Sequence, residues 1–134
     1  MGCFHVDAVI RNIAHRGREE AVPRLLVDTG SERTWVPGEV LERLGVTREK
    51  KDLVFMMANG QQITRSVGYA IVEVTPDYHT VDEVVYAEPG DLSLLGARTL
   101  EGLGVRVDPE QKKLVAAGPS PAAGNFLAFD SQNT

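Results

Sequence analysis

The chain has 134 residues, a length that suits one domain with a modest core, and 43% of its residues are hydrophobic. The formal net charge of −5 argues against nucleic acid and against an anionic membrane surface as partners. The single cysteine, Cys3, excludes an internal disulfide, and no apolar run approaches the roughly 18 residues of a membrane span. A cytoplasmic protein of one domain is therefore predicted.

The first two predicted strands form a hairpin. From Phe4 to Ile10 apolar and polar residues alternate, which is typical of a strand with one buried face. Residues 12–20 are polar and contain Gly17, so they predict an exposed turn. Residues 22–27 are nearly all apolar and predict a second strand that is buried on both faces.

The loop that follows this strand is the strongest candidate for a functional site. Asp28 stands at the strand's end, and a carboxylate there is costly to ionise unless hydrogen-bond donors surround it. Thr29 and Ser31 supply hydroxyls, and Gly30 permits a close approach of the backbone. The Ser31 hydroxyl in particular is a candidate donor to the Asp28 carboxylate. The alternative is an ordinary aspartate that caps its own turn.

A short helix is predicted next. Pro37 suits the first turn of a helix, and Gly45 is a typical residue just after its end. Between them, one face carries the apolar side chains of Val40, Leu41 and Leu44, which we expect to be buried.

A hairpin with a tight tip is predicted in the middle of the chain. Residues 50–57 and 63–75 are the two strands, and residues 58–62, which include Ala58, Asn59 and Gly60, are the turn between them. An Asn-Gly pair favours a two-residue turn because both residues tolerate a positive φ. The tip is therefore placed at Asn59 and Gly60.

The rest of the chain adds short elements. Strands are predicted at 81–87 and 92–95, a helix at 98–103, and a final hairpin from 105–107 and 113–115. The many short strands and two short helices predict a mainly β fold.

Two segments in the two halves of the chain are similar in sequence. LERLGVTREKKDLV starts at Leu41, and LEGLGVRVDPEQKKLV starts at Leu100. Each runs through a helix, Leu-Gly-Val, a basic pair and a strand, which indicates a half-length repeat inside one domain. The alternative is that short amphipathic helices closed by a glycine all look somewhat alike.

The loop at residues 28–33, called the active-site loop below, carries a family resemblance. Apolar residues followed by Asp-Thr-Gly-Ser at 28–31, with Trp-Val-Pro at 35–37, resemble the loop of the aspartic proteases. Over residues 4–115 the chain is similar to the retropepsin-like, retroviral-type (clan AA) branch. That branch has an internal pseudo-twofold and carries two apolar residues and a glycine in its second half, here Leu94, Leu95 and Gly96. The resemblance implies a closed β-barrel with one or two short helices.

The resemblance also implies a reaction and a partner. Aspartic proteases hydrolyse peptides with two carboxyl groups around one water; one is ionised and takes the water's proton, and the other is protonated. The sequence holds a single Asp-Thr-Gly, so a complete site implies a homodimer with Asp28 from each chain. Thr29 would then bridge the two loops, and Ala58, Asn59 and Gly60 would form a flap over an extended apolar peptide. No cofactor or metal is expected.

Several points stay open at this stage. One alternative is a non-catalytic peptide-binding or dimerisation module with the same fold, and another is an unrelated small β domain. Retroviral members often place an arginine directly after the second-half glycine, paired with an acid; here Ala97 takes that place, and Arg98 with Glu32 is the candidate pair. Trp35 is assigned to core packing.

The end of the chain has the composition of a linker. The protease domain is predicted to cover 1–115, and 116–134 forms a tail rich in proline, glycine and alanine that includes the apolar residues 126–129. Three interpretations remain: a disordered tail, a terminal strand in the dimer interface, or a site of self-cleavage.

Overall fold

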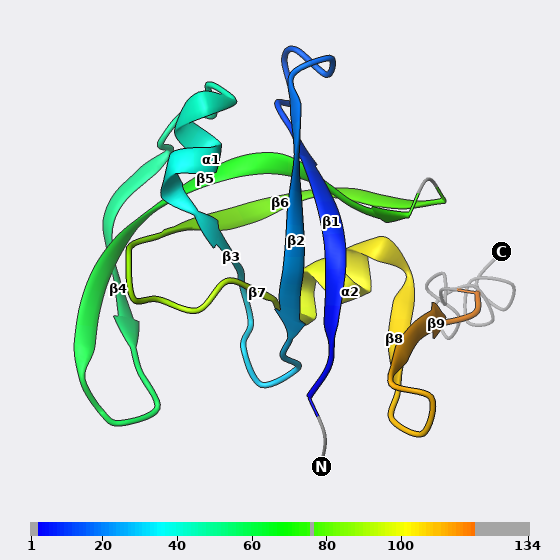
Figure 1. Ribbon diagram of the computed structural model, residues 1–134. Helices are drawn as coiled ribbons and strands as arrows, with labels where there is room; N and C mark the ends of the chain where they lie inside the picture. Colours follow the sequence, from blue (N-terminus) through cyan, green and yellow to red (C-terminus); the bar gives the residue numbers. More distant parts are fainter. Residues whose placement is uncertain (1–2, 76, 120–134) are drawn as a thin grey trace, which may run out of the picture.

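The computed structural model describes residues 3–75 and 77–119, and within them the chain is mainly β, as predicted (Figure 1). The helices are α1 (Gly38–Arg43) and α2 (Ala97–Leu103), and neither is long and apolar enough to cross a membrane. The strands are β1 (His5–Arg11), β2 (Glu19–Val27), β3 (Thr34–Pro37), β4 (Lys50–Met56), β5 (Gln62–Thr75), β6 (Tyr78–Ala87), β7 (Leu94–Leu95), β8 (Val105–Asp108) and β9 (Lys113–Ala116).

The strands of the main sheet form a ring. Their order is β1-β2-β7-β3-β6-β5-β4, and β1 also pairs with β5, which closes the ring and leaves β4 at its edge. The strands β8 and β9 form a separate hairpin beside α2 (Figure 1). This arrangement agrees with the retropepsin-like β fold expected from the sequence.

The two halves of the ring are related by a pseudo-twofold, as the repeat in the sequence predicted. Each half contains a hairpin, a short strand and a helix: β1, β2, β3 and α1 in the first, β5, β6, β7 and α2 in the second. β2 pairs in parallel with β7, and β3 pairs in parallel with β6. The pseudo-twofold exchanges these two parallel pairs, and the loop after β6 is the counterpart of the loop after β2.

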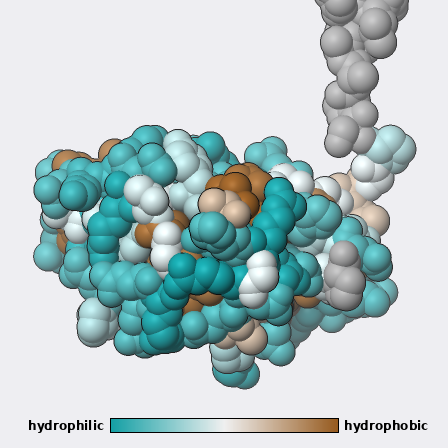
Figure 2. Space-filling view, turned by 90° about the horizontal axis from the view of Figure 1, so that it is seen from above, coloured by the Kyte–Doolittle hydropathy of each residue, from teal (hydrophilic) through white to brown (hydrophobic). Residues whose placement is uncertain are grey.

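The core fills the interior of the ring. Leu25, Leu41 and Leu95 are fully buried there, and each contributes roughly 1.5–3 kcal/mol by leaving water. The predicted buried face of α1 is confirmed, since Val40 and Leu44 are buried beside Leu41. Seen from above in Figure 2, the outer surface is mostly hydrophilic, with apolar side chains in small separate areas.

Two predictions about burial were wrong. In β2 the residues Pro23 and Arg24 are exposed, so this strand is not buried on both faces. The cause is a bulge: Arg24 has a φ of 59°, and its N–H donates to Asp7 Oδ1 at 3.0 Å instead of the regular ladder. The strand predicted at 92–95 begins only at Leu94, and Leu92 is 65% exposed.

The last strand ends one residue beyond the predicted domain boundary. β9 includes Ala116, and its pairing with β8 holds the end of the described chain near α2. The three interpretations of the tail concern residues 120–134, which lie outside the described residues.

Candidate active site

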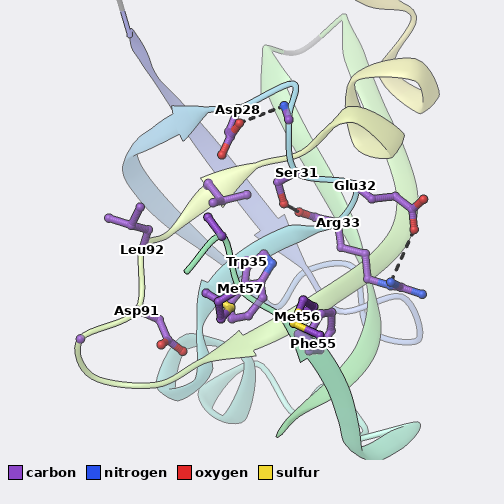
Figure 3. Close-up of a pocket in the computed structure, with 14 residues that line it drawn as sticks. Asp28, Ser31, Glu32, Arg33, Trp35, Phe55, Met56, Met57, Asp91 and Leu92 are labelled. Atoms are coloured by element: carbon purple, nitrogen blue, oxygen red, sulfur yellow. Dashed lines mark hydrogen bonds and ion pairs between the residues drawn. The ribbon is translucent and has the colours of Figure 1, made fainter. Parts of the chain in front are cut away.

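Backbone hydrogen bonds hold the candidate catalytic carboxylate in place. Asp28 follows β2 directly, and its N–H donates to the carbonyl of Leu95 at 3.0 Å. The N–H of Gly30 donates to Asp28 Oδ1 at 2.9 Å (Figure 3). A Cβ on residue 30 would lie 3.2 Å from that same oxygen, so glycine keeps the surroundings of the carboxylate open. Thr29 is exposed.

The predicted hydrogen bond from Ser31 to Asp28 was wrong. The Ser31 hydroxyl donates to the carbonyl of Arg33 at 3.0 Å, and only the Ser31 backbone N–H reaches Asp28, at its carbonyl oxygen. The turn directs the Ser31 side chain back along the loop, so its hydroxyl stabilises the turn rather than the carboxylate.

The second-half turn lies directly behind the active-site loop. Gly96 donates its N–H to Thr34 Oγ1 at 3.0 Å, and an added Cβ would stand 2.4 Å from the carbonyl oxygen of Arg33. The N–H of Ala97 donates to the carbonyl of Ser31 at 2.7 Å. The predicted turn residues Leu95 and Gly96 therefore support the loop from behind, and only glycine fits at the second position.

A buried pair of threonines joins the two halves at the same place. Thr34 and Thr99 are both fully buried, and their hydroxyl oxygens are 2.6 Å apart. The Thr99 hydroxyl donates to Asp82 Oδ2 at 3.0 Å, so the buried hydroxyls are satisfied.

The expected Arg98–Glu32 side-chain pair was wrong. These residues are joined through the backbone, where the N–H of Arg98 donates to the carbonyl of Glu32 at 3.0 Å. The Arg98 guanidinium instead approaches Glu83 at 3.4 Å and Asp82 at 4.0 Å. The arginine stands one position later than in the retroviral pattern, in the first turn of α2, and there its side chain faces β6.

A groove of about 530 Å³ runs beside Asp28. It lies between the active-site loop, the β4–β5 hairpin and the segment before β7 (Figure 3). The lining is largely apolar, and it combines residues of three separate parts of the chain: Asp28, Gly30, Ser31, Glu32, Arg33, Trp35, Phe55, Met56, Met57, Ala58, Gly90, Asp91, Leu92 and Leu94.

The predicted flap residues lie at one end of this groove. Met57 and Gln61 are joined by a backbone hydrogen bond of 2.8 Å, and Gly60 takes a φ of 85° at the tip. Ala58 lines the groove, whereas Asn59 and Gly60 form the exposed tip and are not part of the lining.

Sequence reasoning missed several groove residues. Met56 is 64% exposed and Leu92 is 65% exposed, although both are large and apolar. The available signal in the sequence was that both residues stand next to a predicted turn, where an apolar side chain is easily exposed. Exposed apolar side chains that gather in a concave region mark binding sites. Trp35 is buried, as predicted, and it also forms the groove floor, with its ring 5.1 Å from that of Phe55.

A buried glutamate lies under the groove wall. Glu83 on β6 accepts hydrogen bonds from Lys50 Nζ at 2.5 Å and from Arg33 Nε at 3.0 Å. The hydrogen bond from Lys50, followed by that from Arg33, lowers the pKa of Glu83 to about 2, against the opposing effect of burial. The sequence signal was an acid inside the apolar strand 81–87, which requires partners once it is buried.

Glu83→Gln is expected to lower the free energy of unfolding by about 3 kcal/mol at neutral pH. The pKa of Glu83 is about 2 in the folded protein and near 4.5 ordinarily, so the ionised form is favoured by folding. Its contribution is fully present above about pH 4.5 and declines as the pH falls toward 2. Urea denaturation of both proteins from pH 7 to 2.5 measures this difference, with the exposed Glu110→Gln as control. A difference that does not shrink in acid would contradict the assignment.

A second ion pair fixes the segment that carries Leu92. Arg65 on β5 binds Asp91 through two hydrogen bonds, of 2.7 and 2.9 Å. The hydrogen bond from Arg65 lowers the pKa of Asp91, and the Asp91 carboxylate also accepts the N–H of Glu88 at 2.8 Å. The loop equivalent to the active-site loop is therefore tied to the β4–β5 hairpin.

Comparison with known proteins agrees with this geometry. The model of the family described as "gag-polyprotein putative aspartyl protease" matches residues 19–102. The comparison with curated proteins gave no match. The matched range runs from β2 into α2, and it contains the Asp28 loop, the β4–β5 hairpin and the Gly96 turn. Because the match covers well over half of the chain, the protein belongs to this family of retropepsin-like aspartic proteases.

Proposed function

We propose that the protein is an aspartic endopeptidase that acts as a homodimer and cleaves extended apolar peptide segments with one Asp28 from each chain. The observation that carries this proposal is the state of the carboxyl groups in the groove. Within the described residues the Asp28 carboxylate accepts one hydrogen bond, from the backbone N–H of Gly30, and Asp28 lies inside the range that the family model matches. It is therefore available to bind a water.

The groove lining holds two other carboxylates. Asp91 is bound by Arg65 through two hydrogen bonds, and the exposed Glu32 lies 3.5 Å from Arg33. Because the sequence holds a single Asp-Thr-Gly, the second carboxyl group of the reaction is assigned to Asp28 of another copy of the chain. The exposed Thr29 is assigned to the contact between the two loops across a twofold axis.

The proposed mechanism uses one water between the two Asp28 carboxyls. The ionised carboxylate takes a proton from the water as its oxygen attacks the scissile carbonyl carbon, and the protonated carboxyl donates to the carbonyl oxygen. The N–H of Gly30 keeps one Asp28 oxygen oriented. Ala58, with Asn59 and Gly60 at the hairpin tip, closes over the peptide, and the exposed Met56 and Leu92 exclude bulk water.

A peptide-library digest from about pH 4 to 7 tests this function, with cleavage sites read by mass spectrometry. We expect cuts between apolar residues and a specific activity that rises with protein concentration, because only the dimer holds two carboxyls. Sedimentation over the same concentrations locates the dimer. Peptide binding without any cleavage would favour the non-catalytic module with the same fold. Full activity in a strict monomer would contradict the shared site.

A further inference from the structure

One cation lies in the lining of the groove. Among the described lining residues Arg33 alone carries a positive charge. Its guanidinium carbon lies 5.8 Å from the centre of the Phe55 ring, so it stands over the apolar wall of the groove (Figure 3). The Arg33 side chain is 24% exposed, which leaves it accessible to a bound peptide.

A buried carboxylate fixes the orientation of this guanidinium. Glu83, with a side chain only 7% exposed, accepts a hydrogen bond from Arg33 Nε at 3.0 Å from below the groove wall. Lys50 and Arg98 approach the same carboxylate, at 2.5 and 3.4 Å. Arg98 also lies 4.0 Å from Asp82, but Lys50 and Arg33 both donate to Glu83, so this single carboxylate does not neutralise Arg33 by itself.

The outer side of the guanidinium is only weakly engaged. Arg33 Nη1 lies 3.5 Å from Glu32 Oε1, beyond a good hydrogen bond, and the Glu32 side chain is 68% exposed. Within the part of the chain that the structure describes, Arg33 Nη2 has no hydrogen bond. Arg65, by contrast, donates to Asp91 through Nε and Nη2 and to the carbonyl of Thr64 through Nη1. Arg33 is thus the cation of the groove lining whose Nη1 and Nη2 groups can donate hydrogen bonds to a bound peptide.

We propose that Arg33 makes the groove select peptides that carry an acidic side chain at one position beside the apolar residues, and that Glu83 is the positioning residue that holds Arg33 for this contact. The inference rests on the proposed peptidase function and specifies its substrate class. Glu32 competes for the same guanidinium, and an incoming carboxylate must displace it. Displacement costs little because an exposed ion pair is worth little.

The test compares peptide pairs that differ only by Glu or Gln, placed in turn at each position around the preferred cleavage site. For the wild type we expect kcat/KM to favour Glu about tenfold at one position, the size of one charge-assisted hydrogen bond. Arg33→Gln should bring this ratio to about one, and Arg33→Lys should restore part of it. A wild-type ratio near one at every position would overturn the proposal, and so would a ratio that survives Arg33→Gln.

Three further variants separate positioning from general damage. Glu83→Gln should reduce the Glu/Gln ratio, chiefly through KM for the Glu peptide, while cleavage of the Gln peptide falls less. Glu32→Gln should raise the ratio, because it removes the competitor; an unchanged or lower ratio would count against the contact. Arg106→Gln removes the same charge on β8, outside the groove lining, and should leave the ratio unchanged.

Binding measurements separate this proposal from the peptidase function itself. Fluorescence anisotropy with labelled Glu and Gln peptides is read on the Asp28→Asn protein, with and without Arg33→Gln. Tighter binding of the Glu peptide that depends on Arg33, without hydrolysis by the wild type, would support acid selection and refute the peptidase. Hydrolysis with no charge preference would refute acid selection alone. Absence of both binding and hydrolysis would refute both.

Discussion

Asp28→Asn is expected to abolish peptide hydrolysis, lowering kcat by roughly a thousandfold or more. An amide cannot take a proton from the attacking water, and the substitution removes both carboxyl groups of the proposed dimer at once. The measurement is cleavage of the best library peptide, followed by mass spectrometry over hours. Residual activity within tenfold of the wild type would show that another group performs the chemistry.

The fold and the proposed dimer should survive this substitution. Asparagine has nearly the same shape, and its side-chain oxygen can still accept the Gly30 N–H, which lies 2.9 Å from Asp28 Oδ1. Thermal unfolding and sedimentation should therefore match the wild type. Asp77→Asn, at the exposed turn between β5 and β6, is the matched control and should retain full activity.

Mixing the wild-type protein with the Asp28→Asn variant tests whether two chains share one catalytic site. If each active dimer needs two intact Asp28 side chains, a ninefold excess of the Asp28→Asn chain leaves about one tenth of the activity per wild-type chain, because partners pair at random. Activity that stays proportional to the wild-type chain would place the whole site within one copy.

Local signals in the sequence predicted the elements around the site well. Some features depend on neighbouring residues alone: the apolar strand that leads into Asp28, the hairpin tip at Asn59 and Gly60, and the glycines that end both helices. The structure contains these elements where they were predicted. The repeat predicted the pseudo-twofold because each half carries the same order of elements.

Features that depend on distant residues were not predictable. The three cations around Glu83 come from positions 33, 50 and 98, which only the ring of strands brings together. The predicted hydrogen bond from the Ser31 hydroxyl to Asp28 was wrong for a different reason. The direction of this hydroxyl depends on the path of the loop, which places the Arg33 carbonyl 3.0 Å away. Burial of β2 was misjudged because a bulge at Arg24 is not evident from hydrophobicity.

Gly96→Ala is expected to lower the free energy of unfolding by about 3 kcal/mol, which corresponds to a fall in Tm of roughly 10 °C. The new Cβ would stand 2.4 Å from the Arg33 carbonyl oxygen, 2.6 Å from its carbonyl carbon and 2.9 Å from the Ser31 carbonyl oxygen. All three are backbone atoms of the active-site loop, so no side-chain rotation relieves the contact. The loop itself must move, and differential scanning calorimetry measures the cost.

The same displacement should damage catalysis in whatever fraction remains folded. The loop that meets Gly96 also carries Asp28, and a shift of about 1 Å in a catalytic group can cost on the order of a hundredfold in rate. Gly17→Ala is the matched control, because nothing lies within 4 Å of its added Cβ, and we expect its Tm and kcat/KM to stay close to the wild-type values. If Gly96→Ala behaved like this control, the close approach of the two halves behind Asp28 would be refuted, and with it the argument that the second half of the chain positions the carboxylate.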